Sequence, residues 1–333
     1  PAVLRRYFPT PAHDNVGFYL TGVSSHHEFS ALMTDTVPDL HLLDTGQFFP
    51  RWTWKPVGGR HAAPPEERGE LDLGLDLGRG TSGATASAAV GHEGEVLGGY
   101  RRVDNVTDAT LRTYQDAYGP EVTKADVFYA VYGLLHSPDY RRRYGADLKK
   151  SLPRIPLLAS QEDFVAFATA GRGLADLHLD YEQVAPTPLG ITVDGVPVDW
   201  EDRHGIDPAL LRVTKMRYGK VRREGTRTDD RSTIAYNEHV TLTGIPETAQ
   251  DYQLGARSAL DWLLDRYQVK VDKKSGIVND PNLWMVEGAG GGPTATPQPF
   301  YLLDLIVRVT TVSLRTMAIV ESLPPLRPRE PSA

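Results

Sequence analysis

The architecture expected for this chain follows first from residues 236–284, which read YNEHVTLTGIPETAQDYQLGARSALDWLLDRYQVKVDKKSGIVNDPNLW. The run from Val240 has the β-branched composition of a strand and stops at Gly244-Ile-Pro. A helix is predicted over residues 256–267, because leucines recur there at helical spacing. A strand that is followed by a helix with one apolar side favours a domain that mixes helices with a sheet.

The chain before this stretch is also rich in strand patterns. From Pro186 onwards, strands are predicted at residues 190–193, 211–213 and 232–236. Short strands that lie close together in sequence pair most readily as antiparallel neighbours. The second half of the chain is therefore predicted to form a mostly antiparallel sheet.

Residues 107–182 carry the strongest helix signals. Thr107 is expected to begin one helix, and Thr123 the next, with an acidic residue three positions later that suits a capping box. Further helices are predicted over Pro138–Leu148 and residues 161–178, whose apolar residues recur at helical spacing. These signals place a helical cluster in the first half of the chain.

Three regions are expected along the chain. Residues 1–55 are predicted to form short strands and loops, including a strand that begins near Val16 and a short helix over residues 28–33. Residues 56–99 are dominated by Pro, Gly, Ala and Glu, which indicates a flexible insertion. Residues 100–333 would form the main domain. The predicted fold class is α+β, with helices first and a mostly antiparallel sheet with helices afterwards.

The most apolar run, residues 300–323, is predicted to be an amphipathic helix packed on a core. It is interrupted by Asp304, Arg308 and Arg315. Three charges in a window of this length argue against a transmembrane segment, so no membrane contact is expected.

Composition excludes several classes of protein. The chain has 333 residues, a net charge of −7 and no cysteine. Disulfides, thiolate metal sites and cysteine nucleophiles are therefore excluded, and a reducing cytoplasm is the expected compartment. An acidic chain can contact nucleic acid only through a local basic face.

Such a face is predicted in residues 215–231, where seven side chains are basic and three are acidic. Lys and Arg neutralise phosphates, and Arg can also bind a guanine edge with two hydrogen bonds. A solvated hairpin with no partner is the alternative interpretation. Tyr218 and Asn237 add stacking and hydrogen-bonding groups. The predicted DNA-binding residues are Lys215, Arg217, Tyr218, Lys220, Arg222, Arg223, Arg227, Arg231 and Asn237.

A metal-dependent nuclease is a second hypothesis. Pro138-Asp139 followed by Asp147-Leu148-Lys149 matches the outline of a PD…(D/E)xK site, in which two carboxylates bind Mg²⁺ beside a lysine. Both halves fall in helical sequence, which would separate the carboxylates by roughly 12 Å at 1.5 Å per residue. That distance is too long for one shared ion.

Four further blocks of sequence accompany the 236–284 stretch. They are FSALMTD (29–35), YAVYGLLHSPDYR (129–141), LKKSLPRIP (148–156) and AGRGLADLHLDYE (170–182). In this order, the blocks resemble the C-terminal target-recognition region of type ISP restriction–modification enzymes. Those enzymes join nuclease, helicase, adenine methyltransferase and DNA-specificity modules in one polypeptide.

The resemblance implies sequence-specific recognition of double-stranded DNA, which directs adenine-N6 methylation and restriction as a defence against phage. The methyltransferase, Walker and nuclease motifs of the family do not occur in these residues, so neither catalytic residues nor metal ligands are expected here. S-adenosylmethionine, ATP and Mg²⁺ are expected only in upstream modules. The expected partners are DNA and the upstream methyltransferase and helicase–nuclease modules. A docking domain that makes no base contacts is an alternative. The start PAVLRRYF, without Met, suggests a fragment of a longer chain.

Overall fold

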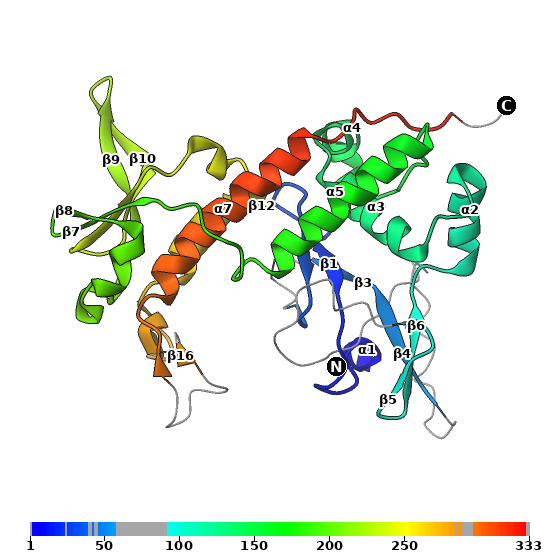
Figure 1. Cartoon of the computed structure of the whole chain (residues 1–333), viewed down its shortest axis with the longest axis horizontal. Helices are drawn as coiled ribbons and strands as arrows, with labels where there is room; N and C mark the ends of the chain where they lie inside the picture. Colours follow the sequence, from blue (N-terminus) through cyan, green and yellow to red (C-terminus); the bar gives the residue numbers. More distant parts are fainter. Residues whose placement is uncertain are drawn as a thin grey trace. The chain divides into compact units, whose positions relative to one another are not determined.

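The computed structural model describes residues 2–23, 25–38, 42, 46–57, 92–283, 286–287 and 296–330. The chain divides into two compact units, and many of its helices and strands are labelled in Figure 1. Unit 1 comprises Pro1–Asp180, Leu254–Ala256 and Ala318–Ala333, and unit 2 comprises Tyr181–Gln253 and Arg257–Met317. Helices and antiparallel sheets occur in both halves of the chain, with a five-stranded sheet in the second half, which confirms the predicted α+β class. Most of the predicted insertion lies outside the described residues.

Unit 1 contains two small antiparallel sheets, in the orders β2-β1-β3 and β4-β6-β5. The predicted helix over residues 28–33 is wrong. Residues from Ala31 onwards form a strand instead, because Met33 pairs with Phe18 and both side chains are buried. The strands are β1 (Gly17–Leu20), β2 (Ala31–Thr34), β3 (Gln47–Pro50), β4 (Trp52–Pro56), β5 (Val96–Leu97) and β6 (Tyr100–Asp104).

The predicted helices of residues 107–182 are all present. After a short α1 (Ala2–Tyr7), they are α2 (Asp108–Tyr118), α3 (Lys124–His136), α4 (Pro138–Leu148) and α5 (Gln161–Leu179). The capping box is confirmed: the amide of Asp126 donates to the Thr123 hydroxyl at 3.1 Å, and the Asp126 carboxylate accepts from the Thr123 amide at 2.9 Å. Helices α3 and α5 pack closely at Gly133 and Gly171.

Unit 2 is built on one antiparallel sheet of order β8-β7-β11-β10-β9. Its strands are β7 (Gly190–Val193), β8 (Val196–Val198), β9 (Arg217–Arg223), β10 (Thr226–Ala235) and β11 (Val240–Thr243). The strand predicted at residues 211–213 is wrong. A 3₁₀ turn, η3 (Pro208–Leu211), precedes an extended segment there, because the Asp207 carboxylate caps the turn by accepting from the Ala209 amide at 2.9 Å.

Two helices complete unit 2. Helix α6 (Ala259–Arg266) begins later than predicted, because Ser258 and Asp261 form a capping box that fixes its start. Helix α7 (Tyr301–Glu321), whose residues up to Met317 belong to unit 2, matches the prediction, and its buried face includes Leu302 and Ile306. Within the described part of the chain, none of the helices is both long and apolar enough to cross a membrane.

Shorter elements lie between these. They are η2 (Trp200–Gly205), η4 (Glu247–Gln250), β12 (Gln253–Leu254), β13 (Arg257–Ser258), β14 (Lys270–Val271), β15 (Val278–Asn279), η5 (Pro281–Leu283), β16 (Val286–Glu287) and β17 (Thr296–Pro297).

Candidate nucleic-acid interface

A hollow on unit 2 gathers most of the basic side chains predicted to bind DNA. It has a volume of about 990 Å³. Its basic lining residues are Arg212, Lys215, Arg217, Lys220, Arg227 and His239; the others are Ala209, Thr214, Tyr218, Gly219, Ala235, Asn237 and Glu238. With a single carboxylate among these cations, the surface is suited to bind phosphate oxygens. We call it the basic hollow.

The β9–β10 hairpin extends beyond the rest of the sheet (Figure 1). Its turn residues Glu224 and Gly225 have φ values of 47° and 81°. Two successive positive φ angles are the requirement of a two-residue type I′ turn, which matches the twist of the flanking strands. The turn places Arg222 and Arg223 at the far end of the hairpin. The Arg222 Nε atom donates to the Gly225 carbonyl at 3.3 Å.

The cations of the basic hollow differ in how far they are neutralised. Lys220 forms an ion pair with Asp229, its partner on the neighbouring strand. Within the part of the chain that the structure describes, Lys215, Arg217 and Arg227 form no ion pair, and all three are exposed. Their charge is therefore available to an external anion.

Arg231 and Tyr218 are instead bound within unit 2. The Arg231 guanidinium donates to Asp261 at 2.9 and 3.1 Å and to the Gln250 side chain at 3.0 Å. It also lies 4.9 Å from the ring centroid of Tyr218. Tyr218 is only 8% exposed, and burial raises the pKa of its hydroxyl to about 12. These two predicted residues thus stabilise the sheet against α6.

Both polar atoms of the Asn237 side chain form hydrogen bonds within the fold. Its amide nitrogen donates to the carbonyls of Leu210 at 2.7 Å and Arg212 at 3.0 Å. Its amide oxygen accepts from the backbone nitrogens of His239 at 2.9 Å and Val240 at 2.7 Å. Asn237 therefore anchors the segment that lines the basic hollow.

Three lining residues were missed by sequence reasoning. His239 lies 2.8 Å from the Asp194 carboxylate, and this hydrogen bond raises the pKa of the histidine. Glu238 lies 3.5 Å from the other ring nitrogen of His239. Arg212 pairs with Asp280 at 2.6 Å. Glu238 and His239 directly follow Asn237, whereas Arg212 lies in a separate loop after η3, so the sequence does not show that the two segments line one hollow.

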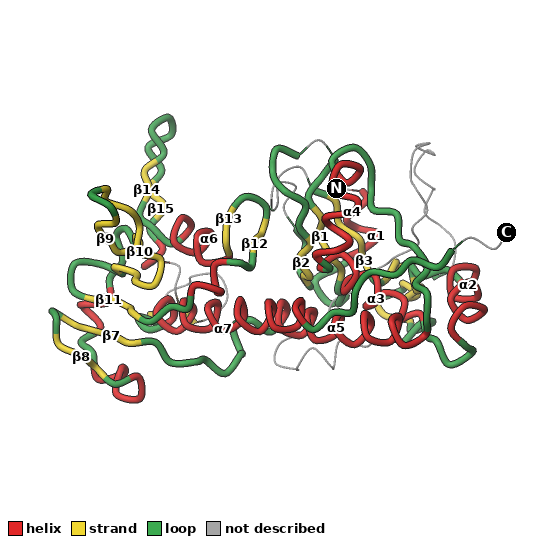
Figure 2. The backbone as a smooth tube through the Cα atoms, turned by 90° about the horizontal axis from the view of Figure 1, so that it is seen from above, coloured by secondary structure: helices red, strands yellow, loops and turns green. Residues whose placement is uncertain are grey.

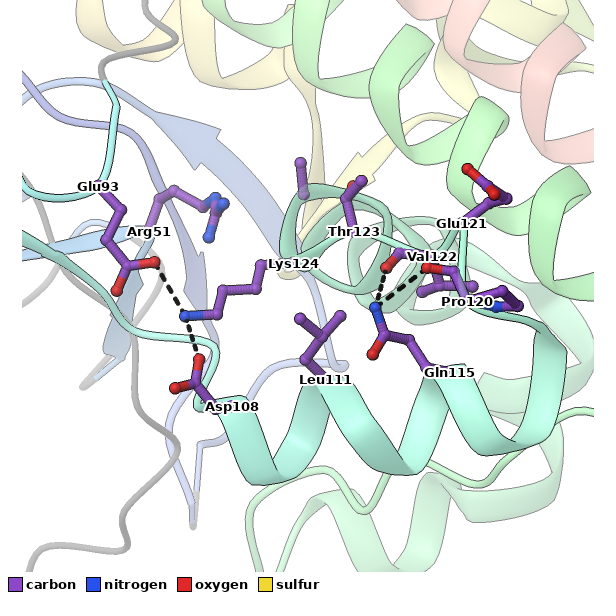
Figure 3. A pocket seen from close by; sticks show the side chains of 11 residues that line it. Arg51, Glu93, Asp108, Leu111, Gln115, Pro120, Glu121, Val122, Thr123 and Lys124 are labelled. Carbon is purple, nitrogen blue, oxygen red and sulfur yellow. Dashed lines mark hydrogen bonds and ion pairs between the residues drawn. The ribbon is translucent and has the colours of Figure 1, made fainter.

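A second pocket, in unit 1, has a volume of about 680 Å³ (Figure 3). Lys124 lies in it between two carboxylates, 3.0 Å from Glu93 and 2.7 Å from Asp108. Arg51 is paired with the buried Asp104. Because these two cations are already neutralised by neighbouring carboxylates, this pocket is less suited to phosphate than the basic hollow.

Residues 2–290 match the family model of the type ISP C-terminal specificity domain. The chain belongs to this family. The match spans both units, so the basic hollow is part of a specificity domain.

Three solved structures, two of them of type ISP enzymes, are similar to the specificity domain. A nuclease-deletion mutant of the type ISP enzyme LlaGI, in complex with a DNA substrate mimic, is 29% identical with a TM-score of 0.64 over 98% of this chain. The ATP-dependent type ISP enzyme LlaBIII, bound to DNA, is 26% identical with a TM-score of 0.69 over 98%. The DrdV–DNA complex is 28% identical with a TM-score of 0.64 over 93%.

The specificity domain spans only part of those enzymes. It covers 22% of the LlaGI chain, 17% of the LlaBIII chain and 25% of the DrdV chain. The sequence matches none of the curated proteins with which it was compared.

The geometry of the specificity domain does not favour the nuclease hypothesis. Asp139 and Asp147 lie near opposite ends of one helix, α4, as expected. Asp139 is paired with Arg142, and Lys149 is paired with Glu28 at 2.9 Å. Among the described residues, no group of three or more His, Cys, Asp or Glu side chains could hold a metal ion.

Proposed function

We propose that this specificity domain recognises a sequence in double-stranded DNA through the basic hollow and the β9–β10 hairpin. The observation that carries the proposal is a set of three cations in the hollow, Lys215, Arg217 and Arg227, that pair with none of the described carboxylates, in a chain of the specificity-domain family. It is supported by the three similar enzymes, each of which was solved with DNA or a DNA substrate mimic.

The cations are assigned two roles. Lys215 and Lys220 provide point charges for phosphate oxygens, which position the duplex without reading its sequence. Arg217, Arg222, Arg223 and Arg227 carry planar guanidinium groups that can bind guanine O6 and N7 together. Arg231, Tyr218 and Asn237 act indirectly, because their contacts shape the sheet and the segment that lines the hollow.

Glu238 adds a discriminating group to the same surface. A carboxylate repels phosphates, but it accepts a hydrogen bond from the amino group of cytosine. Its place in the basic hollow therefore fits recognition of base edges better than purely nonspecific binding to the backbone.

The specificity domain would act within a larger enzyme. We propose that it directs adenine-N6 methylation of host sites and restriction of unmodified DNA in the cytoplasm, with methyltransferase and helicase–nuclease modules doing the chemistry. S-adenosylmethionine, ATP and Mg²⁺ would be bound by those modules. The length of the similar enzymes, of which this chain covers a quarter or less, supports this arrangement.

A double variant tests the proposed surface. Arg217→Ala with Arg227→Ala is expected to weaken binding to a duplex by roughly 1–3 kcal/mol per arginine that reads a base. The matched control, Lys55→Ala with Arg112→Ala, removes the same charge from exposed positions in unit 1 and should bind as the wild type does. Equal losses in both variants would show that only net charge matters, and no loss in either would exclude this surface.

A further inference from the structure

A second projecting element of unit 2 is the β14–β15 hairpin, which extends away from the other elements of that unit (Figure 2). Its turn is held by the Asp272 carboxylate, which accepts from the backbone nitrogens of Lys274 at 3.0 Å and Ser275 at 2.7 Å. The carboxylate is thus engaged with the turn. The turn presents Lys273 and Lys274 to solvent, and neither forms an ion pair within the described residues.

The same hairpin exposes large apolar side chains. Val271, Ile277 and Val278 are 59%, 67% and 56% exposed. Val271 and Val278 are directly opposite each other across the two strands, so both side chains lie on one face. An isolated two-stranded ribbon is marginally stable, and exposed apolar side chains grouped on it mark a contact surface.

Hydrogen bonds tie the base of this hairpin to the wall of the basic hollow. The amide of Val269 donates to the carbonyl of Thr214 at 2.9 Å, and Thr214 lines the hollow. Asn282, which follows the hairpin, accepts from the amide of Val213 at 2.9 Å and donates to its carbonyl at 2.7 Å. Both ends of the hairpin are therefore anchored to the segment that positions Lys215.

The charge of the hairpin indicates the class of its partner. Lysine is depleted in protein–protein interfaces, whereas lysines beside apolar side chains suit phosphates beside sugars and thymine methyl groups. A two-stranded ribbon also fits the width of the major groove. We propose that the β14–β15 hairpin is a second DNA-binding element. Lys273 and Lys274 contact phosphates, and the Val271–Val278 face lies against the wall of the groove. This inference rests on the proposed function.

The salt dependence of binding tests the lysine contacts. The full chain is titrated with a short random-sequence duplex over a range of salt concentrations. Lys273→Ala with Lys274→Ala is expected to make the slope of log K against log salt less steep by about 2, because each lost phosphate contact changes it by about 0.9. The control Lys55→Ala with Arg112→Ala should keep the wild-type slope. A wild-type slope in the lysine variant would overturn the assignment of phosphate contacts.

A second variant tests the apolar contact. Val271→Ser with Val278→Ser is expected to weaken binding without changing the slope, because removing a neutral side chain releases no counterion. Thermal unfolding checks that both variants fold. If the wild type binds DNA and both variants bind it as tightly as the wild type does, the hairpin makes no DNA contact and its apolar face serves another protein module. If the wild type does not bind even at low salt, the proposed function itself fails.

Discussion

At the residue scale, Arg231 shows that a cation within a basic segment need not face a ligand. Arg231→Ala removes the hydrogen bonds to Asp261 and Gln250, so it is expected to lower the free energy of unfolding by about 1–2 kcal/mol. Arg227→Ala removes no ion pair with any residue that the structure describes, and it should change stability by less than about 0.5 kcal/mol. Urea unfolding and duplex binding, measured on both variants, separate the two roles. Loss of stability in the Arg227 variant and not in the Arg231 variant would contradict this assignment.

Asn237 is expected to matter more for stability than for direct DNA contact. Asn237→Ala removes four hydrogen bonds to backbone groups, and the expected loss is about 2–3 kcal/mol in the free energy of unfolding. Asn105→Ala, in which one hydrogen bond to the Pro50 carbonyl is lost, is a control with an expected loss of about 1 kcal/mol. An Asn237 variant as stable as the wild type, in denaturant unfolding, would exclude the anchoring role.

At the scale of elements, the contact between α3 and α5 depends on glycine. A Cβ atom on Gly171 would lie 1.8 Å from the Tyr129 carbonyl oxygen, which is backbone and cannot move cheaply. Gly171→Ala is therefore expected to destabilise unit 1 by about 1–3 kcal/mol. Gly145→Ala in α4 meets no atom within 4 Å, so it should instead stabilise by about 0.5–1 kcal/mol. Equal melting temperatures for the two variants would show that the helices do not need this close approach.

The helices that the sequence predicts correctly are those whose ends are fixed locally. Thr123 caps α3 through residues three positions away, so the signal is contained in a few letters. The helix prediction for residues 28–33 was wrong because the strand there depends on pairing with β1, which no local sequence pattern indicates. The strand prediction for residues 211–213 was wrong because Leu211 and Val213 are buried in the core of unit 2 from an irregular segment.

The candidate site, too, can be predicted from the sequence only where its residues lie close together in the chain. The segment from Lys215 to Arg227 could be found in the sequence, because the cations of one hairpin are contiguous. Arg212 and the hydrogen bond between His239 and Asp194 could not be found, because the segments that carry these residues come together only in the folded sheet. The direction of a side chain is also missing from the sequence, which does not show that Arg231 donates to Asp261 of α6.

At the scale of the whole molecule, stability is expected to depend on pH through two buried histidines. The Nδ1 atom of His136 donates to the Tyr132 carbonyl at 2.9 Å, and Nδ1 of His178 lies 2.5 Å from the Tyr132 hydroxyl. Burial lowers the pKa of His136 and lowers that of His178 to about 3, from an ordinary value of 6.5. Both are neutral when folded, whereas the unfolded chain binds protons below 6.5.

The stabilisation that comes from keeping the two histidines neutral is complete above pH 6.5. It is lost as the pH falls towards their folded-state pKa values, by at most about 1.4 kcal/mol per histidine for each pH unit. Denaturant unfolding at pH 7 and pH 5 measures it. A free energy of unfolding that stays constant between these values would contradict neutral burial of the pair.

The claim that this specificity domain reads DNA is tested most directly by selection from a pool of randomised duplexes. The full chain is mixed with the pool at a low and a higher salt concentration, and the retained duplexes are sequenced. We expect one enriched sequence motif and retention that falls steeply with salt, because the cations of the basic hollow replace counterions on the phosphates. Absence of any retention at low salt would exclude DNA recognition by this domain.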